Sequence, residues 1–190
     1  RTLDVLLEER AGSLTREDAG RASPEQIGPY PILGKLGEGS FGVVYVAQQE
    51  SPVRRRVALK VLRRGMATHE VLERFALERR ALATMNHPAI AQVFDAGETD
   101  TGEPYFVMEL VEGKPLTQYC DEQQLSLVER IQLFQQICEG VQHAHHKGII
   151  HRDLKPGNIL VARDGDQHLP KILDFGLAKA TSDEARDGMA

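Results

Sequence analysis

The chain has 190 residues with 23 basic and 28 acidic side chains, a formal net charge of -5, and 41% hydrophobic residues. This composition is typical of a folded globular protein and excludes a disordered or collagen-like chain. The acidic balance provides no extended positive field, so we expect no nucleic acid partner, and any phosphate ligand must be bound locally.

The two cysteines, Cys120 and Cys138, are too few for a disulfide framework and lack the spacing of metal ligands. Reduced thiols in the cytoplasm are therefore expected, with a single disulfide as the alternative. No apolar run approaches the roughly 18 residues of a membrane span, so we expect no membrane contact within this segment. The chain begins at Arg1 and stops in a polar stretch, which suggests a fragment.

The first half of the chain has the pattern of a β-rich unit. Residues 1–28 are polar and punctuated by glycine and proline, which predicts a leader or linker. Three antiparallel strands are predicted at 32–36, 43–48 and 56–62, with a turn at 50–52. Residues 67–85 have helical spacing, and strands at 90–94 and 105–110 follow, joined by a turn at 97–102.

The second half is helical in pattern. Ser126 and Glu129 have the spacing of a capping box, which predicts the start of a long helix that ends at Lys147-Gly148. Short strands are predicted at 159–161 and 171–173. A β-rich half followed by a helical half predicts an α+β fold of two lobes. The predicted apolar face of the long helix consists of Ile131, Phe134, Cys138 and Val141.

The glycine cluster GEGSFGVV at 37–44 fits G-x-G-x-x-G, a pattern shared by nucleotide sites and by plain glycine-rich turns. Because β-branched and aromatic residues follow it, we expect a hairpin rather than the start of a helix. Glycines there would let backbone amides approach phosphate oxygens closely. A plain turn without a ligand is the alternative.

Two charged side chains stand where core residues are expected. Strand alternation places Lys60 on the same face as Ala58, and Glu78 occupies the centre of an apolar helical stripe. A buried carboxylate is costly unless a cation pairs with it, so Lys60 is the best partner for Glu78. The alternatives are an exposed Lys60, and pairing of Glu78 with Arg79, with Arg80 or with the arginine run 54–56.

The segments 151–158 (HRDLKPGN) and 174–176 (DFG) bring two carboxylates, an amide and a lysine together around a short hairpin. Phosphoryl transfer to a hydroxyl needs such groups: a carboxylate to accept the proton, oxygen ligands for magnesium, and a cation for the developing charge. A metal site at His143, His145 and His146 is the weaker alternative in this region, because no thiol completes a ligand set.

With the glycine loop and the segment VALK at 57–60, these motifs stand in the order found in eukaryotic-type protein kinases. From about residue 30 to its end, the sequence resembles the serine/threonine branch of that family, and within it the bacterial members. The resemblance implies a two-lobed kinase fold, with a complete N-lobe at about 29–110 and the start of the C-lobe at 111–190. It also implies transfer of the γ-phosphate of ATP, with Mg²⁺, to protein serine or threonine hydroxyls.

The resemblance carries roles over to particular residues. Asp153 corresponds to the catalytic base and Lys155 to a contact of the γ-phosphate. Lys60 corresponds to the contact of the α- and β-phosphates, with Glu78 as its partner. The positions that correspond to magnesium ligands are Asn158 and Asp174. The positions that correspond to nucleotide contacts are Leu36, Gly37, Glu38, Gly39, Ser40, Phe41, Gly42, Val43, Val44, Ala58, Lys60, Met108, Glu109, Leu110 and Val111.

The sequence departs from the family pattern at its end, where it stops before any A-P-E motif. We therefore expect a truncated C-lobe with exposed helix faces, and a polypeptide that is poorly stable and weakly active by itself. Two alternative functions are an ATP-binding pseudokinase scaffold and a kinase of small molecules on a related fold. Retention of Lys60, Asp153, Asn158 and Asp174 favours catalysis. A second copy of the chain is an expected autophosphorylation partner.

Overall fold

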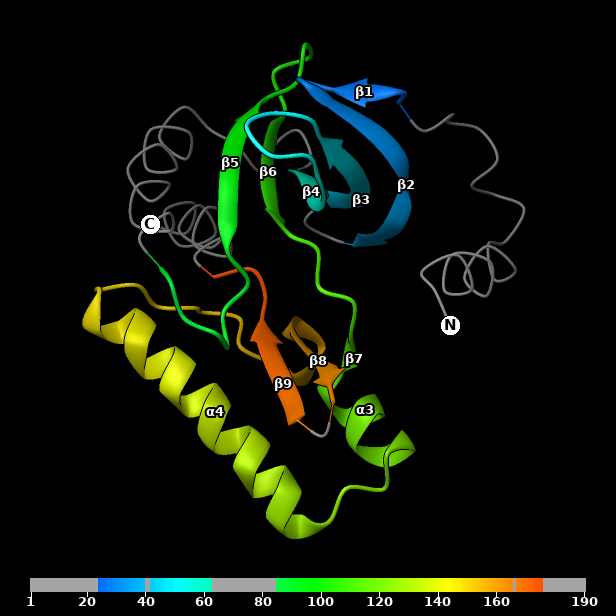
Figure 1. Cartoon of the computed structure of the whole chain (residues 1–190). Helices are drawn as coiled ribbons and strands as arrows, with labels where there is room; N and C mark the ends of the chain where they lie inside the picture. The colour runs from blue at the N-terminus through cyan, green and yellow to red at the C-terminus, as the bar shows by residue number, and fades with distance from the viewer. Residues whose placement is uncertain (1–23, 40–41, 63–84, 166, 176–190) are drawn as a thin grey trace, which may run out of the picture.

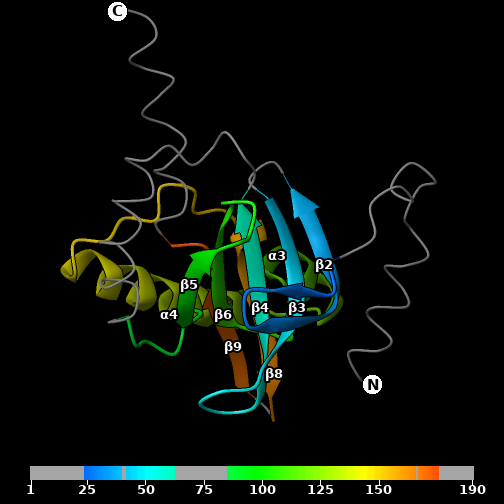
Figure 2. The same cartoon turned by 90° about the horizontal axis from the view of Figure 1, so that it is seen from above.

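The computed structural model of the chain describes residues 24–39, 42–62, 85–165 and 167–175. These residues form an upper body of β-strands and a lower body in which a long helix lies beside a small sheet (Figure 1). Seen from above, the upper strands lie side by side over the long helix and the lower hairpin (Figure 2). The expected α+β arrangement of two lobes is therefore present.

The upper body is a six-stranded sheet with the order β1-β2-β3-β4-β6-β5, and all of its neighbouring strands are antiparallel. A residue of the expected leader belongs to it, because Ile27 is only 6% exposed and pairs with Tyr30. The strands are β1 (Gln26–Ile27), β2 (Tyr30–Gly39), β3 (Gly42–Gln49), β4 (Arg55–Leu62), β5 (Val93–Glu98) and β6 (Pro104–Glu109).

The strand predicted at 90–94 is present, but its bounds were wrong, because it lies at 93–98. The apolar residues that suggested the earlier start are buried for another reason. Ile90 is 2% exposed and forms an isolated parallel bridge with Ile172 of the lower body. Strand-like composition at this point therefore reflects a contact between the two bodies. The helix predicted at 67–85 falls, except for its last residue, outside the described residues.

Strand alternation sorts the upper sheet into two faces, as β4 shows. Val57 and Leu59 pack in an outer cluster with Val107 of β6. Ala58 and Leu62 point to the opposite side and join a cluster that includes residues of the lower body. The face that carries Lys60 is therefore the face turned toward the lower body.

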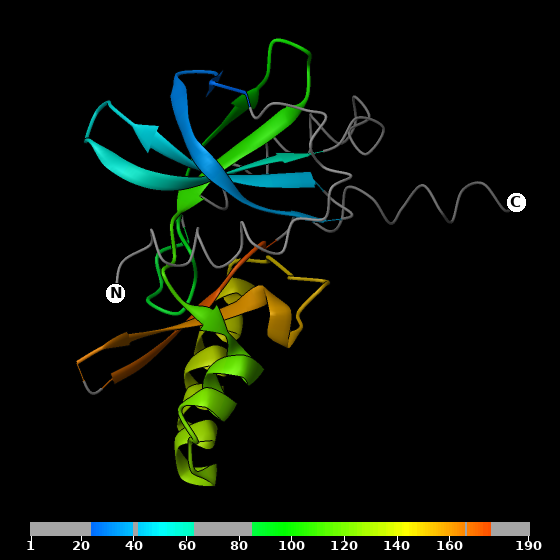
Figure 3. The same ribbon diagram turned by 90° about the vertical axis from the view of Figure 1, so that its right-hand side faces the viewer.

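The lower body consists of helices and a three-stranded sheet with the order β7-β8-β9 (Figure 3). Among the described residues, no helix combines the length and the low charge needed to cross a bilayer. The elements are β7 (Lys114–Pro115), α3 (Leu116–Glu122), α4 (Leu127–His146), the single 3-10 turn η1 (Pro156–Asn158), β8 (Ile159–Asp164) and β9 (Gln167–Ile172).

Helix α4 begins where the capping box predicted it. The backbone N–H of Glu129 donates to the Ser126 hydroxyl, and the backbone N–H of Ser126 donates to the Glu129 carboxylate at 2.7 Å. Each side chain thus satisfies one of the N–H groups that have no partner at the start of a helix.

The predicted apolar face of α4 was wrong for three of its four residues, whereas Val141 packs against the core as predicted. Ile131 and Phe134 are 49% and 63% exposed, and Cys138 is exposed too. The helix instead packs through the row Leu133, Ile137, Gly140 and Ala144. A Cβ placed on Gly140 would lie 3.2 Å from Cδ1 of Ile172, so small residues let β9 approach closely. The predicted face was chosen from the large apolar side chains of α4. The helix packs instead through a row that includes the small residues Gly140 and Ala144.

Mutations on the buried and exposed faces of α4 are expected to change the free energy of unfolding by different amounts. Leu133 is 1% exposed, so Leu133→Ala is expected to lower the free energy of unfolding by about 2–5 kcal/mol. Phe134→Ala, on the neighbouring residue of the open face, should change it by less than about 0.5 kcal/mol. Urea denaturation followed by circular dichroism would measure both variants. A larger loss for Phe134→Ala than for Leu133→Ala would contradict the burial described above.

Candidate active site

The glycine cluster lies in the hairpin of β2 and β3, as expected, with Gly37 paired with Val44 and Gly39 paired with Gly42. Gly42 has a φ of +155°, and a Cβ there would lie 1.9 Å from the carbonyl oxygen of Val61. Only glycine fits this close approach of β4. At Gly37 and Gly39 a Cβ would meet nothing within 4 Å, so packing among the described residues does not require glycine there.

Lys60 lies in the middle of β4, paired with Val44 on one side and with Phe106 on the other. It is only 8% exposed. Its ammonium donates a hydrogen bond to Oδ2 of Asp174 at 2.6 Å, which joins the upper body to the lower one. The burial of Lys60 agrees with the expected inward face, whereas its predicted pairing with Glu78 stays a prediction. The predicted partner Glu78 lies outside the described residues, as do Ser40 and Phe41.

An apolar cluster lies beside the glycine hairpin and includes side chains on the same face of the sheet as Lys60. The structure brings together five of the side chains that the sequence assigned to a nucleotide site. Ala58 and Met108 are buried in this cluster, and the other three pack against it while remaining partly exposed. The five residues are Leu36, Val44, Ala58, Met108 and Leu110.

Asp153 is held by two residues of its own loop. The ammonium of Lys155 donates to Oδ2 of Asp153 at 2.7 Å, and Nδ2 of Asn158 donates to the same oxygen at 3.1 Å. Nδ2 of Asn158 also donates to the carbonyl oxygen of Asp153 at 2.8 Å. Among the described residues, no hydrogen bond reaches Oδ1 of Asp153. The hydrogen bond from Lys155 has the largest effect on this carboxyl and, with the weaker effect of Asn158, holds its pKa below the ordinary value, although burial opposes the shift.

His151 connects this loop to the end of β9. Its ring is 2% exposed and packs against Phe175 with a centroid distance of 4.7 Å. The N–H of Asp153 donates to Nδ1 at 3.3 Å, so Nδ1 is unprotonated and Nε2 carries the proton. Nε2 lies 2.8 Å from the carbonyl oxygen of Leu173 and donates to it. A neutral imidazole thereby fixes the backbone next to Asp153 relative to the backbone next to Asp174.

The backbone is left-handed at two positions of the site. Arg152 has a φ of +66° and Asp174 a φ of +60°, in a region that residues other than glycine, asparagine and aspartate rarely occupy. The N–H of Leu173 also donates to the carbonyl oxygen of Asn158 at 2.8 Å. The two loops therefore reach their positions at some backbone cost, and hydrogen bonds between them compensate for it.

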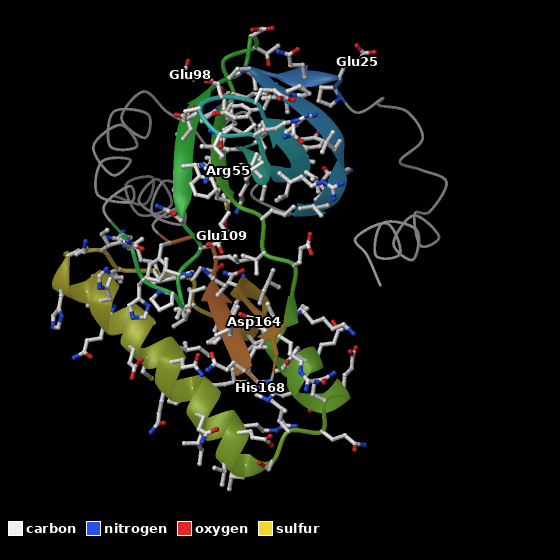
Figure 4. The ribbon with its side chains drawn as sticks, in the orientation of Figure 1. Glu25, Arg55, Glu98, Glu109, Asp164 and His168 are labelled. Carbon is white, nitrogen blue, oxygen red and sulfur yellow. The ribbon has the colours of Figure 1, made fainter. Side chains whose placement is uncertain are left out.

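Sequence reasoning missed one ion pair at this site. Lys171 of β9 donates to both carboxylate oxygens of Glu109, at 2.8 and 2.9 Å. Glu109 is the last residue of β6 and lies where the chain passes from the upper to the lower body (Figure 4). The N–H of Gln92 donates to the same carboxylate at 3.2 Å. The only signal in the sequence was a lysine between apolar residues of a short strand, as at Lys60.

The structure does not favour the alternative metal site near the end of α4. His145 and His146 are exposed, whereas His143 faces His87 of the segment before β5, with a ring-centroid distance of 5.2 Å. Within the described part of the chain, no three histidine, cysteine or acidic side chains converge on one point.

Comparison with known families gives a match over most of the chain. The family model of the protein kinase domain matches residues 30–189. Among curated proteins, serine/threonine-protein kinase Pkn1 of Myxococcus xanthus is 38% identical over 156 residues, which cover 81% of this chain and 22% of Pkn1. Serine/threonine-protein kinase PknA of Mycobacterium tuberculosis is 42% identical over 159 residues, which cover 80% of this chain and 36% of PknA. The chain thus spans a minor part of the length of these relatives.

Solved structures show the same architecture. The crystal structure of the Mycobacterium tuberculosis PknI kinase domain superposes with a TM-score of 0.70 at 31% sequence identity. The superposition covers 82% of this chain and 63% of the PknI chain.

The contacts of Asp153 predict how its carboxyl titrates. Lys155→Met removes the hydrogen bond that contributes most to the low pKa, so the pKa of Asp153 should rise toward its ordinary value. Lys114→Met is the matched control, since Lys114 lowers the pKa of Glu122 instead. Carboxyl NMR titrations of the two variants would measure both groups. An unchanged pKa of Asp153 in Lys155→Met would contradict the assignment.

Proposed function

The chain belongs to the protein kinase family, and from that premise we propose that the protein transfers the γ-phosphate of ATP to serine or threonine hydroxyls of other proteins. The observation that carries the proposal is the grouping around Asp153. A carboxylate, a lysine and an amide share one loop, and Lys60 of the other lobe meets Asp174 within 2.6 Å. Phosphoryl transfer to an alcohol needs this set of groups.

Asp153 has the properties of the group that accepts the hydroxyl proton. Its low pKa keeps the carboxyl ionised at neutral pH. Lys155 and Asn158 hold Oδ2, so Oδ1 is the oxygen that an incoming serine or threonine hydroxyl would reach. The side chain is 36% exposed, so a peptide can approach it from solvent. Lys155, which is 53% exposed, would then offer its ammonium to the transferred phosphoryl group.

The nucleotide would lie between the two bodies. The apolar side chains beside the glycine hairpin provide a surface for the adenine ring, and Gly37 and Gly39 leave room for phosphates close to backbone amides. Glu109 and Val111 lie on the segment between the bodies, where backbone groups can meet the edge of the base. Lys60 is placed to neutralise phosphate oxygens at the inner end of this space.

The donor set also fits a divalent cation of the Mg²⁺ type. Nδ2 of Asn158 is used by Asp153, which leaves its Oδ1 as an acceptor, and Asp174 offers its carboxylate from the facing loop. Such hard oxygen donors suit Mg²⁺. The ion would supply charge neutralisation between the phosphates. Without it, Lys60 provides the counter-charge to Asp174.

The scaffold alternative is disfavoured by the same residues. A protein that only binds ATP has no chemical need for Asp153 with its two partners. Protein substrates and a second copy of the chain remain the expected partners. Cys120 and Cys138 are both free, which fits a reducing compartment such as the cytoplasm.

Asp153→Asn tests the assignment of the base. In the full-length protein, it should lower the rate of phosphate transfer from labelled ATP by about 10²- to 10⁴-fold. The affinity for a fluorescent ATP analogue should stay within about three-fold of wild type, because Asp153 lies outside the nucleotide pocket. Asp121→Asn, an exposed aspartate of α3, is the control and should keep full activity. Equal transfer by the wild type and Asp153→Asn would refute the assignment, and ATP binding without transfer by the wild type would favour the scaffold.

Lys60→Met tests the nucleotide site separately. Removing the ammonium leaves Asp174 without its cation and the phosphates without a contact. The affinity for ATP should fall by about ten-fold or more, since a charge-assisted hydrogen bond is worth about 1.5–3 kcal/mol. Lys147→Met, at the exposed end of α4, serves as the control. Isothermal titration with ATP and Mg²⁺ would measure both, and an unchanged affinity in Lys60→Met would contradict the proposed pocket.

A further inference from the structure

Residues 85–92 connect the two bodies independently of the covalent passage at Glu109. This segment descends from the upper body to the level of α4 and β9 before it rises into β5 (Figure 1). The N–H of Ile172 donates to the carbonyl oxygen of Ala89 at 2.8 Å, and the N–H of Ala91 donates to that of Ile172 at 3.0 Å. Ala89 and Ile90 are 3% and 2% exposed. The segment therefore forms an isolated parallel bridge with β9 of the lower sheet.

A histidine closes the turn that presents this segment to β9. Nδ1 of His87 accepts a hydrogen bond from the N–H of Ala89 at 3.2 Å, and the carbonyl oxygen of His87 accepts one from the N–H of Ile90 at 3.0 Å. An accepting Nδ1 carries no proton, so this turn requires a neutral His87 ring.

We call the pairing of residues 89–91 with Ile172 the joint. The side of α4 that faces His87 is also unsuited to a protonated His87 ring. The rings of His87 and His143 have a centroid distance of 5.2 Å. Nε2 of His143 is buried and has no hydrogen-bond partner among the described residues. Gly140 lies one turn earlier on α4, and a Cβ there would be 3.5 Å from Nδ1 of His87. The helix thus offers no side chain at Gly140 that could accept a hydrogen bond from a protonated Nδ1.

Three ionisable groups act on His87 from the elements packed against it: His143 and Glu139 of α4, and Lys171 of β9. Burial, the largest effect, lowers the pKa of His87 below its ordinary value, and His143 lowers it further. Glu139 opposes the shift and Lys171 reinforces it weakly. Lys171 is itself paired with Glu109 at 2.8 Å.

We infer that the contact of His87 with His143 makes the attachment of the two bodies sensitive to pH, firm while His87 is neutral and weakened when it takes up a proton. A proton on Nδ1 turns the acceptor of the Ala89 N–H into a donor, so two donors face each other. It also places a positive charge next to His143 and Lys171. Neither consequence requires ATP or phosphate transfer, so the inference stands apart from the proposed function.

The direction of the effect follows from linkage. Because the folded chain holds His87 neutral more strongly than the unfolded chain does, the unfolded or locally opened state binds more protons in this range. The stabilisation is therefore fully present above the ordinary histidine range. It is lost progressively as the pH falls through and below that range.

Amide hydrogen exchange of the 190-residue chain can follow the joint directly. We expect the protection of the Ala91 and Ile172 amides to fall by about three-fold or more between about pH 7.5 and pH 5.5, after correction for intrinsic exchange. Amides of the β3–β4 pair provide the internal reference and should keep their protection. Equal protection of Ala91 and Ile172 at both pH values would overturn the inference.

Variants and a direct titration complete the test. His87→Asn offers an amide oxygen to the Ala89 N–H without a titrating group, so protection at about pH 7.5 should remain while its fall on acidification disappears. His146→Asn, on an exposed histidine of the same helix, should keep the full response. The ring protons of His87 in the wild type should titrate below the ordinary range of a histidine. A response that persists in His87→Asn, or titration of the His87 ring within or above the ordinary range, would refute the role of His87.

Discussion

The backbone pairing of residues 89–91 with Ile172 fixes where the two bodies of the chain meet, and the candidate site depends on it. Ile172 is two residues from Asp174, so the strand that receives the upper body also carries the carboxylate that faces Lys60. A displacement at this joint would separate the ammonium of Lys60 from Asp174, which are 2.6 Å apart. If the chain passage at Glu109 were the sole connection, the lobes could rotate freely about it. The second attachment, at residues 89–91, limits the lobes to small movements about the line that joins the two attachments.

A second set of contacts gives the lower body its internal geometry. The neutral ring of His151 connects the backbone at Asp153 with that at Leu173, and Asn158 holds the carbonyl oxygen of Asp153. The two acidic side chains therefore belong to one hydrogen-bonded unit. Buried or half-buried charges recur as pairs around it, since an unpaired charge would cost several kcal/mol. The pairs reach from β4 to the loop after β9 and from β9 to β6.

Much of this arrangement could be predicted because it depends on local patterns. The β2–β3 hairpin, the capping box at Ser126 and the inward face of Lys60 follow from residue types at fixed spacings. The motifs at 151–158 and 174–176 identified the family, which the matches to kinase sequences and structures confirm. The individual roles of the site residues stay predictions.

The remaining features could not be read from spacing, because they depend on contacts between distant segments. Helix α4 packs through Gly140 and Ala144 rather than through Ile131 and Phe134, since β9 needs room close to the helix axis. Ile90 looked like part of a strand of the upper sheet, although its partner is Ile172, far along the chain. The pairing of Lys171 with Glu109 likewise depends on how the lobes meet. Side-chain size and alternation carry no information about such partners.

The left-handed backbone at Asp174 has a consequence for engineering this protein. Adopting that conformation costs a residue with a Cβ roughly 1–2 kcal/mol, and it costs glycine almost nothing. Asp174→Gly would relieve this backbone cost, but it would leave the ammonium of Lys60, which is 8% exposed, without its acidic partner. Because an unpaired buried charge costs several kcal/mol, this single change should lower the melting temperature. A thermostable variant with glycine at this position would therefore need a neutral residue at position 60 as well, so a screen by melting temperature alone would lose both charges together.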